Sequence, residues 1–189
     1  QLSLAKFLFI TADDSNKLSA SNVQPFLQFV LERIDLARDI HFYTNTSIDT
    51  LDYSGTGLNQ GSKVVFAAYG EIKRSLCTEI PDSLKELRDF VNPKLVMPGI
   101  VCMNAKKFTD YNNAKKELEI FNEQLVPEIL NMKELPMIVV CDDSDFTAAN
   151  LRNFLWVTFT RCNPAKDIYG IDSFYENKHW GCNGPVVID

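Results

Sequence analysis

The chain has 189 residues, of which 46% are hydrophobic and 23% charged, and its formal net charge is −6. These values are ordinary for a folded domain with a sizeable core, and the acidic balance argues against a nucleic-acid partner, which needs a basic stripe. The five cysteines contain no C-x-x-C pair, which argues against a zinc ribbon or a disulfide framework and indicates a reducing, cytoplasmic setting.

The first part of the chain reads as strand, helix, strand and strand. Residues 6–11 (KFLFIT) predict a buried strand, and apolar side chains at helical spacing predict a helix over 21–37. A strand over 39–43 follows, and then a glycine-rich loop over 52–61 leads into a strand over 63–69. Because a phosphate-binding fingerprint would open a helix rather than precede a strand, this loop predicts a plain turn.

The second part alternates between the same element types. The predicted elements are a short helix over 81–90, a strand over 94–103 that Pro98 bends, a helix over 110–125, a strand over 136–141, a helix over 147–161 and a strand over 167–171. From Asp172 onward an irregular, aromatic tail is expected. Strands separated by helices predict an α/β fold, with a layered, mainly parallel or mixed sheet and helices on its faces.

A strand–helix–strand unit occurs twice, first near Lys6 and again near Pro136. Residues 18–41 align without gaps to residues 146–169, at an offset of 128. Identical pairs include Ala20/Ala148, Asn22/Asn150, Phe26/Phe154, Leu27/Leu155, Arg33/Arg161, Ala37/Ala165, Asp39/Asp167 and Ile40/Ile168. Just upstream, D-D-S at 13–15 faces D-D-S at 142–144. A shared hydrophobic pattern explains the apolar pairs but not the polar ones, which favour a real duplication.

The acidic cluster of Asp142, Asp143 and Asp145 lies where a strand ends and a helix begins. It fits the D-x-D-x-T pattern of a magnesium-dependent phosphatase, in which one aspartate is the nucleophile and the pair holds the ion. Only about 40 residues follow, too few for the other groups of such a site. The alternative is helix capping, with Thr147 here and Ser19 in the first copy as N-caps.

The end of the second helix and the segment after the last strand carry the other candidates. Arg161 suits a helix C-terminus, and a fork to Asp167 would tie the helix to the next strand. The chain has two histidines. His41 lies in a strand and is expected in the core or on the surface. His179 lies in a polar, aromatic loop, and such loops at the carboxyl edge of a sheet commonly line ligand sites.

At these residues the sequence resembles the C-terminal region of the UbiD family, the 3-polyprenyl-4-hydroxybenzoate decarboxylases. An apolar strand leads into Asp142, Asp143 and Asp145, a helix with Trp156 follows, and then T-R-x-x-P-x-x-D supplies Thr160, Arg161, Pro164 and Asp167. The stretch I-D-T-L-D-Y-S-G-T-G-L-N-Q-G-S-K, at 48–63, is similar to the family's loop after that strand. The resemblance implies a first partial module over 1–70, a connection over 71–93 and a second, more typical module over 94–189.

The resemblance also implies a reaction, the non-oxidative decarboxylation of an aromatic, polyprenyl-hydroxybenzoate-like acid in ubiquinone or menaquinone biosynthesis. Its cofactor is prenylated FMN with Mn or Mg and potassium, bound by an upstream domain of the same chain, so none is expected on this fragment. This region would close the substrate cleft and make homo-oligomer contacts, without catalytic residues of its own. Phe174, Tyr175, His179 and Trp180 are the substrate-side candidates.

The sequence begins at Gln1, and we expect an excised part of a longer enzyme that is inactive alone. No apolar run reaches the length of a membrane span, which predicts a cytoplasmic enzyme, with peripheral membrane association of the full-length form left open. Two alternatives remain: a phosphatase-like enzyme that uses Asp143 and Asp145, and a non-catalytic assembly module.

Overall fold

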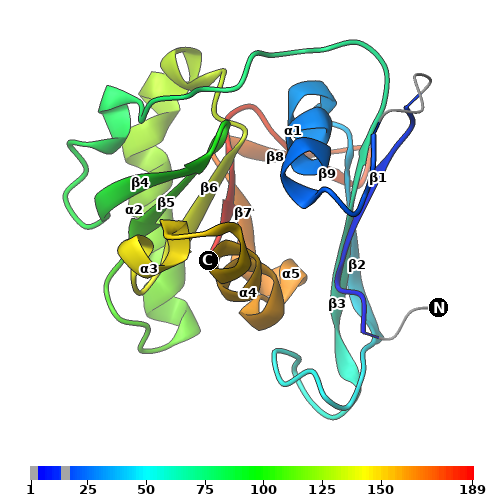
Figure 1. Cartoon of the computed structure of the whole chain (residues 1–189). Helices are drawn as coiled ribbons and strands as arrows, with labels where there is room; N and C mark the ends of the chain where they lie inside the picture. The colour runs from blue at the N-terminus through cyan, green and yellow to red at the C-terminus, as the bar shows by residue number, and fades with distance from the viewer. Residues whose placement is uncertain (1–3, 14–17) are drawn as a thin grey trace.

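The structure is a computed structural model that describes residues 4–13 and 18–189. Two main sheets enclose two helices between them, and a third helix covers the far face of the larger sheet (Figure 1). The predicted α/β fold with a mixed sheet is confirmed, since parallel and antiparallel strand pairs occur in both sheets. The division into modules over 1–70 and 94–189 stays a prediction.

The smaller sheet is formed by the first part of the chain. It contains β1 (Phe7–Thr11), β2 (Ile40–Ser47) and β3 (Gln60–Ala68), and helix α1 (Val23–Arg33) connects β1 to β2. The strand order is β1-β3-β2, and β3 runs parallel to β1 and antiparallel to β2. The last strand of this unit is therefore the central one.

The larger sheet has five strands in the order β4-β5-β6-β10-β7. Its strands are β4 (Val91–Met97), β5 (Ile100–Asn104), β6 (Met137–Cys141), β7 (Ile168–Gly170) and β10 (Val186–Ile188). The helical segments of this half are η1 (Asp82–Leu84), α2 (Tyr111–Leu125), η2 (Val126–Met132), α3 (Ser144–Ala148), α4 (Leu151–Arg161) and α5 (Pro164–Asp167). Every residue of β6 is buried, as its continuous apolar sequence predicts for a strand covered on both faces.

The duplication predicted from the sequence has a counterpart in the topology. In the second unit, β10 lies between β6 and β7, parallel to β6 and antiparallel to β7. The first unit has the same order and the same strand directions. The sequence offset of 128 carries α1 onto α4 residue for residue, and Ile40, at the start of β2, onto Ile168, at the start of β7. The acidic triplet of the first copy falls partly outside the described residues.

Two buried clusters hold these layers together. The larger one lies between the sheets, where α1 contributes Val30, the residue that ends this helix contributes Ile34, and α4 contributes the fully buried Phe154. The smaller one lies between α2, through Phe121 and Leu125, and the opposite face of the larger sheet. Since the larger cluster draws on both sheets, the two units share one core.

Three elements predicted for the middle of the second half were wrong in detail. The strand expected over 94–103 is two antiparallel strands, because Gly99, with φ +81°, supplies the left-handed residue that turns the chain between β4 and β5. The helix expected over 147–161 is broken into α3 and α4, because Asn150 is extended and caps the second helix by accepting from the Asn153 amide at 3.0 Å. The helix expected over 81–90 is the single turn η1.

The predicted boundaries of the first helix and the predicted tail also need correction. Helix α1 spans Val23–Arg33 rather than 21–37, since the chain is already extended at Ile34. The segment after Asp172 is not irregular. It forms the hairpin β8 (Ser173–Glu176) and β9 (His179–Cys182), and then β10, which enters the larger sheet.

Candidate functional site

A groove separates the edge strand β2 of the smaller sheet from the β8–β9 hairpin. Its volume is about 360 Å³, and its walls include His41, Tyr175, Lys178, His179 and Trp180. The groove thus joins the two halves of the sequence at one surface, with aromatic and basic side chains on its walls.

The hairpin is held by local geometry and by a close approach to the first unit. Its two loop residues, Asn177 and Lys178, have φ of 50° and 64°, which suits a tight turn between Glu176 and His179. A side chain at Gly181 would drive its Cβ into the carbonyl oxygen of Ala37, so only glycine allows this contact. The hairpin is therefore pinned against the segment that follows α1.

Ring contacts order the interior of the groove. Trp180 meets Phe42 edge-to-face, with ring centroids 5.2 Å apart. The imidazoles of His41 and His179 lie 5.3 Å apart, tilted by 53°. The Nε2 atom of His179 is buried and has no hydrogen-bond partner among the described residues. The groove therefore offers aromatic faces and the cation of Lys178 to a ligand.

The structure brings together most of the residues proposed on the substrate side. Tyr175, His179 and Trp180 line the groove, while Phe174 lies on the same hairpin opposite Gly181 and does not line it. Sequence reasoning missed His41 as a groove residue. Its neighbour across the groove lies 138 residues away in the sequence, and no local pattern links the two.

The acidic cluster lies at the start of α3, where Asp143 and Asp145 make local contacts. Asp143 is the N-cap and accepts from the Phe146 amide at 2.9 Å, so the expectation that Thr147 caps this helix was wrong. Asp145 pairs with Lys94 at 2.8 Å, and the hydrogen bond from that ammonium lowers the pKa of Asp145 below its ordinary value. Within residues 4–13 and 18–189, no three His, Cys, Asp or Glu side chains converge to hold a metal ion.

The T-R-x-x-P-x-x-D motif spans the end of α4 and the whole of α5. The guanidinium of Arg161 lies over the ring of Trp156 at 4.5 Å. Asp167 instead accepts from the backbone amide of Asn163 at 2.5 Å, so the structure replaces the expected Arg161–Asp167 fork with two separate contacts. Pro164 begins α5, and Thr160 donates to the carbonyl of Trp156.

The same contact recurs in the first copy. There Asp39 accepts from the amide of Asp35 at 2.9 Å, at positions 128 residues upstream of the Asp167 and Asn163 pair. The aspartate shared by both copies thus closes the turn that follows each helix. The aspartate that ends the T-R-x-x-P-x-x-D motif therefore has the same structural role as Asp39 in the first copy.

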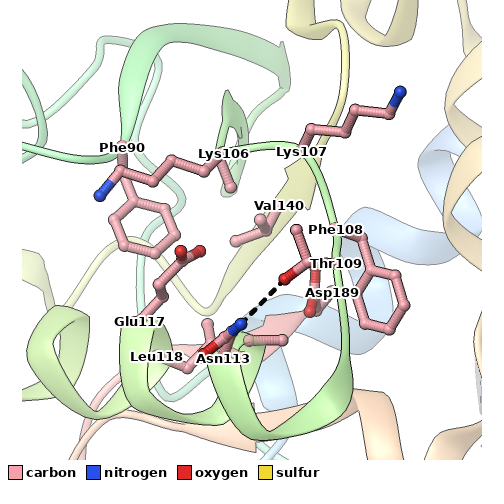
Figure 2. A pocket seen from close by; sticks show the side chains of 12 residues that line it. Phe90, Lys106, Lys107, Phe108, Thr109, Asn113, Glu117, Leu118, Val140 and Asp189 are labelled. Atoms are coloured by element: carbon pink, nitrogen blue, oxygen red, sulfur yellow. Dashed lines mark hydrogen bonds between the residues drawn. The ribbon is translucent and has the colours of Figure 1, made fainter.

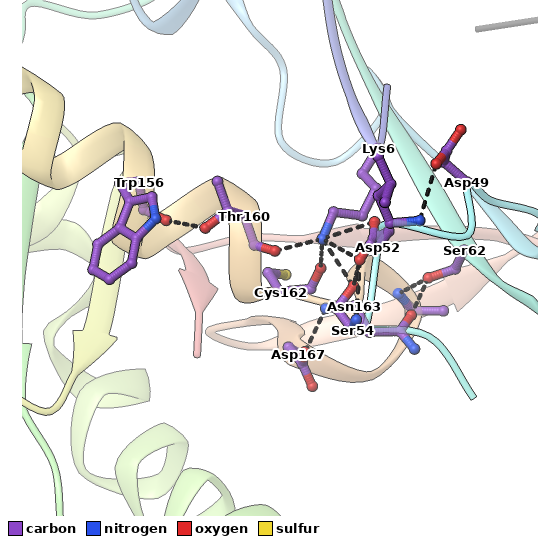
Figure 3. Close-up of polar contacts among 12 residues, drawn as sticks. Lys6, Asp49, Asp52, Ser54, Ser62, Trp156, Thr160, Cys162, Asn163 and Asp167 are labelled. Atoms are coloured by element: carbon purple, nitrogen blue, oxygen red, sulfur yellow. Dashed lines mark hydrogen bonds and ion pairs between the residues drawn. The ribbon is translucent and has the colours of Figure 1, made fainter. Parts of the chain in front are cut away.

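Lys6 ties the second helix end to the first unit (Figure 3). Its ammonium is buried and lies 3.2 Å from Asp52, and it donates to Ser54 at 2.8 Å. It also donates to the carbonyls of Thr160 and Cys162, at 2.9 and 3.0 Å. A cation is favourable at this end of a helix, where carbonyls lack partners.

A second hollow lies at the carboxyl ends of β5, β6 and β10, the edge at which open α/β sheets commonly bind ligands. Figure 2 shows part of it, lined by Phe90, Lys106, Val140 and Asp189. A neighbouring space of about 350 Å³ shares Lys106, Val140 and Asp189 with it and is also lined by Arg161. Burial raises the pKa of Asp189 to about 6, and the charge of Asp167 adds to that effect.

The described residues thus form a mixed α/β module with a built groove and without a metal-ligand cluster. Comparison with known proteins shows which family its first unit resembles. Residues 1–68 match the family model of the 3-octaprenyl-4-hydroxybenzoate carboxy-lyase C-terminal domain. This match confirms the resemblance to the C-terminal region of the UbiD family.

Several chlamydial proteins are similar along the chain. A Chlamydia pneumoniae protein named as a subunit of 4-hydroxybenzoate decarboxylase is 31% identical over the whole chain, and uncharacterized proteins of Chlamydia trachomatis and Chlamydia caviae are 32% identical over 100% and 89% of it. The chain spans about 30% of the length of the first two and 26% of the third. No solved structure matches.

Proposed function

We propose that this chain is the C-terminal part of a longer UbiD-like decarboxylase that acts on an aromatic, polyprenyl-hydroxybenzoate-like acid. In this proposal it packs on a cofactor-binding domain, and its groove closes one side of the substrate cleft. Homo-oligomer contacts, a cytoplasmic location and a place in quinone biosynthesis belong to the same proposal. In the described part of the chain, no helix is long and apolar enough to cross a membrane.

One observation carries the proposal. The family match ends at residue 68, which is the last residue of β3. The segment shared with the carboxy-lyases is therefore one complete structural unit, β1 to β3 with α1, rather than a stretch of chance similarity. The groove wall formed by β2 belongs to this unit.

Prenylated FMN with its divalent metal and potassium would bind outside this chain. Among residues 4–13 and 18–189, no three His, Cys, Asp or Glu side chains converge on a site for that metal. The chain's own contribution is to shape the cleft and exclude water from it.

The test compares the isolated chain with the longer protein that contains it. Purified 1–189 should neither bind flavin nor release CO₂ from 4-hydroxybenzoate-type acids, whereas the longer protein should do both. In the longer protein, Trp180→Leu should raise KM by about tenfold through lost aromatic contact, and Trp156→Leu, outside the groove, is the matched control. Turnover by 1–189 alone, or equal kinetics for the two variants, would contradict the proposal.

An assembly role without chemistry is the second candidate, and one surface favours it. Leu8 and Ile10 on the edge strand β1 are 45% and 47% exposed, and such apolar edges readily pair with other chains. Light scattering on 1–189 and on Ile10→Lys addresses this role; a monomer at every concentration would exclude self-assembly. The phosphatase alternative has no comparable support, because Asp143 caps α3 and Asp145 pairs with Lys94.

A further inference from the structure

We propose that a strand–helix pair directly upstream of β1 in the longer protein covers the outer face of the smaller sheet, which is the face turned away from α1. This outer face carries Leu8 and Ile10 of β1 and Val65 of β3. The strand would extend the sheet beyond β1, and the helix would lie across these three side chains. Such a cover rests on the proposed function, in which the chain is part of a longer protein.

Strands β1 and β3 have the sequence of strands that are buried on both faces. They run parallel, and F-L-F-I at 7–10 and V-V-F-A-A at 64–68 are continuous apolar runs. Parallel strands of this kind are almost always covered on both sides. Leu8 and Ile10 are nevertheless 45% and 47% exposed, and none of the helices within the described ranges packs on this side of the sheet (Figure 1). The outer face therefore lacks the cover that its sequence predicts.

The strand register relates each residue of the outer face to one residue of the second unit. In both units a row of three paired residues crosses the strands and faces the core between the sheets. The rows are Phe9, Phe66 and Ile40 in the first unit, and Val139, Ile188 and Ile168 in the second. Neighbouring residues along a strand face opposite sides of the sheet. Three residues of the second unit therefore correspond to the outer face: Ile138 to Leu8, Val140 to Ile10 and Val187 to Val65.

In the second unit the corresponding face is covered. Ile138, Val140 and Val187 are at most 4% exposed. They share one buried cluster with three residues of α2, which are Leu118, Phe121 and Leu125. Strand β5 also pairs in parallel with β6, on the edge away from β10, whereas the corresponding edge of β1 has no partner among the described strands. The second unit thus has two elements, β5 and α2, whose counterparts are missing from the described part of the first.

The order of elements along the chain gives the place of the missing pair. Strand β5 and then α2 precede β6, and α2 ends 12 residues before β6 begins. Counterparts in the same order would precede β1, which begins at Phe7, and would lie upstream of residue 1. The family model that matches is that of a C-terminal domain, and the chain spans about 30% of the length of two chlamydial relatives, which leaves length for such a pair. Its helix should be amphipathic, with apolar residues at the spacing of Leu118, Phe121 and Leu125.

The first experiment measures access to the outer face by thiol alkylation. Leu8→Cys and Ile10→Cys are made in the longer protein and in 1–189, whose own five cysteines are buried. Peptide mass spectrometry follows the reaction of each position with iodoacetamide, and the matched control is Tyr53→Cys, at a side chain that is 90% exposed. In the longer protein both outer-face cysteines should react at least about tenfold more slowly than the control, and in 1–189 within about threefold of it.

The second experiment identifies what lies on the outer face. Tyr43 of β2 lies on this face and is 60% exposed, and at the offset of 128 it corresponds to Ile171, which belongs to the cluster around α2. The photoreactive amino acid p-benzoylphenylalanine resembles tyrosine in shape and replaces it in the longer protein. On irradiation it should crosslink to the helix directly upstream of β1, as identified by peptide mass spectrometry.

Three results would overturn the proposal. They are control-like reactivity of both cysteine variants in the longer protein, a crosslink to a second copy of the chain, and a crosslink to a segment that does not directly precede β1. Mixing isotope-labelled with unlabelled protein separates crosslinks between copies from those within one chain. Circular dichroism checks that each variant is folded, and either cysteine variant suffices if the other is not. Neither readout uses turnover, so an inactive longer protein would contradict the decarboxylase assignment alone, and an active one with an open outer face would contradict this cover alone.

Discussion

Removal of the buried ammonium of Lys6 should be among the most destabilising single changes in this chain. Lys6→Met keeps the apolar stem but leaves Asp52, whose side chain is 9% exposed, without its ion-pair partner. It also leaves the carbonyls of Thr160 and Cys162 without this donor. Breaking a buried pair by removing one partner costs about 3–5 kcal/mol of unfolding free energy, which for a chain of this size lowers the melting temperature by about 10 °C.

The assay is urea unfolding followed by circular dichroism, with the double variant Lys6→Met/Asp52→Asn included. Because the double variant no longer buries an unpaired carboxylate, it should recover part of the loss, and the coupling energy should be about 1–3 kcal/mol. The matched control is Lys85→Met, which removes an exposed ion pair with Asp82 and should change little. A loss for Lys6→Met as small as that of the control, or strictly additive single effects, would refute the reasoning.

The same residues predict a pH dependence. Burial raises the pKa of Asp52, but hydrogen bonds from Ser54 and the charge of Lys6 outweigh it, so the pKa lies below the ordinary value of 3.8. A carboxyl whose pKa is lowered on folding adds stability above its unfolded pKa and loses it as pH falls through the folded pKa. The stability of the unchanged chain should therefore drop below about pH 4, and Lys6→Met should show a shallower drop.

Three further predictions use the same unfolding assay. Phe154→Ala should cost about 3–5 kcal/mol, because this ring is fully buried between the sheets, and a loss below about 1 kcal/mol would argue against the shared core. Asp143→Ala should cost about 1 kcal/mol through the lost N-cap of α3, whereas Asp143→Asn, which can still accept the bond, should cost less. Asp189→Asn should raise stability at pH 7 but not at pH 3. The folded pKa of Asp189, about 6, lies above its unfolded value, so ionisation of this carboxyl at pH 7 opposes folding. Equal effects of the substitution at both pH values would contradict this.

The repeat was the most informative feature of the sequence. Matching residues such as Arg33 and Arg161 predicted a duplicated unit, and both units have the same strand order and directions. The repeat could also have corrected a boundary, because Asn22 and Asn150 are one of its identical pairs and each directly precedes a helix. Apolar side chains continue at helical spacing across Asn150, so one unbroken helix was predicted where the structure has α3 and α4.

The groove could not be predicted in the same way, for two physical reasons. The turn at Asn177 and Lys178 places a lysine at positive φ, where the usual signal is glycine, so the hairpin left no clear trace. Strand β10 has three residues, too few for a period, and its assignment depends on β6 and β7 beside it. The pairing of His41 with His179 follows only once that hairpin is docked through Gly181.

The placement of the last strand at the centre of each unit sets the timing of folding during synthesis. Strand β6 gains its partner β10 only after residues 186–188 are made, which at about 5–20 residues per second is roughly 2–10 s after β6 itself. Until then one edge of a wholly apolar strand is unpaired in the nascent chain, where it can bind other unfolded chains. Expression yield, more than final stability, is therefore the quantity that this order of strands puts at risk, and the length of chain between β6 and β10 determines how long the risk lasts.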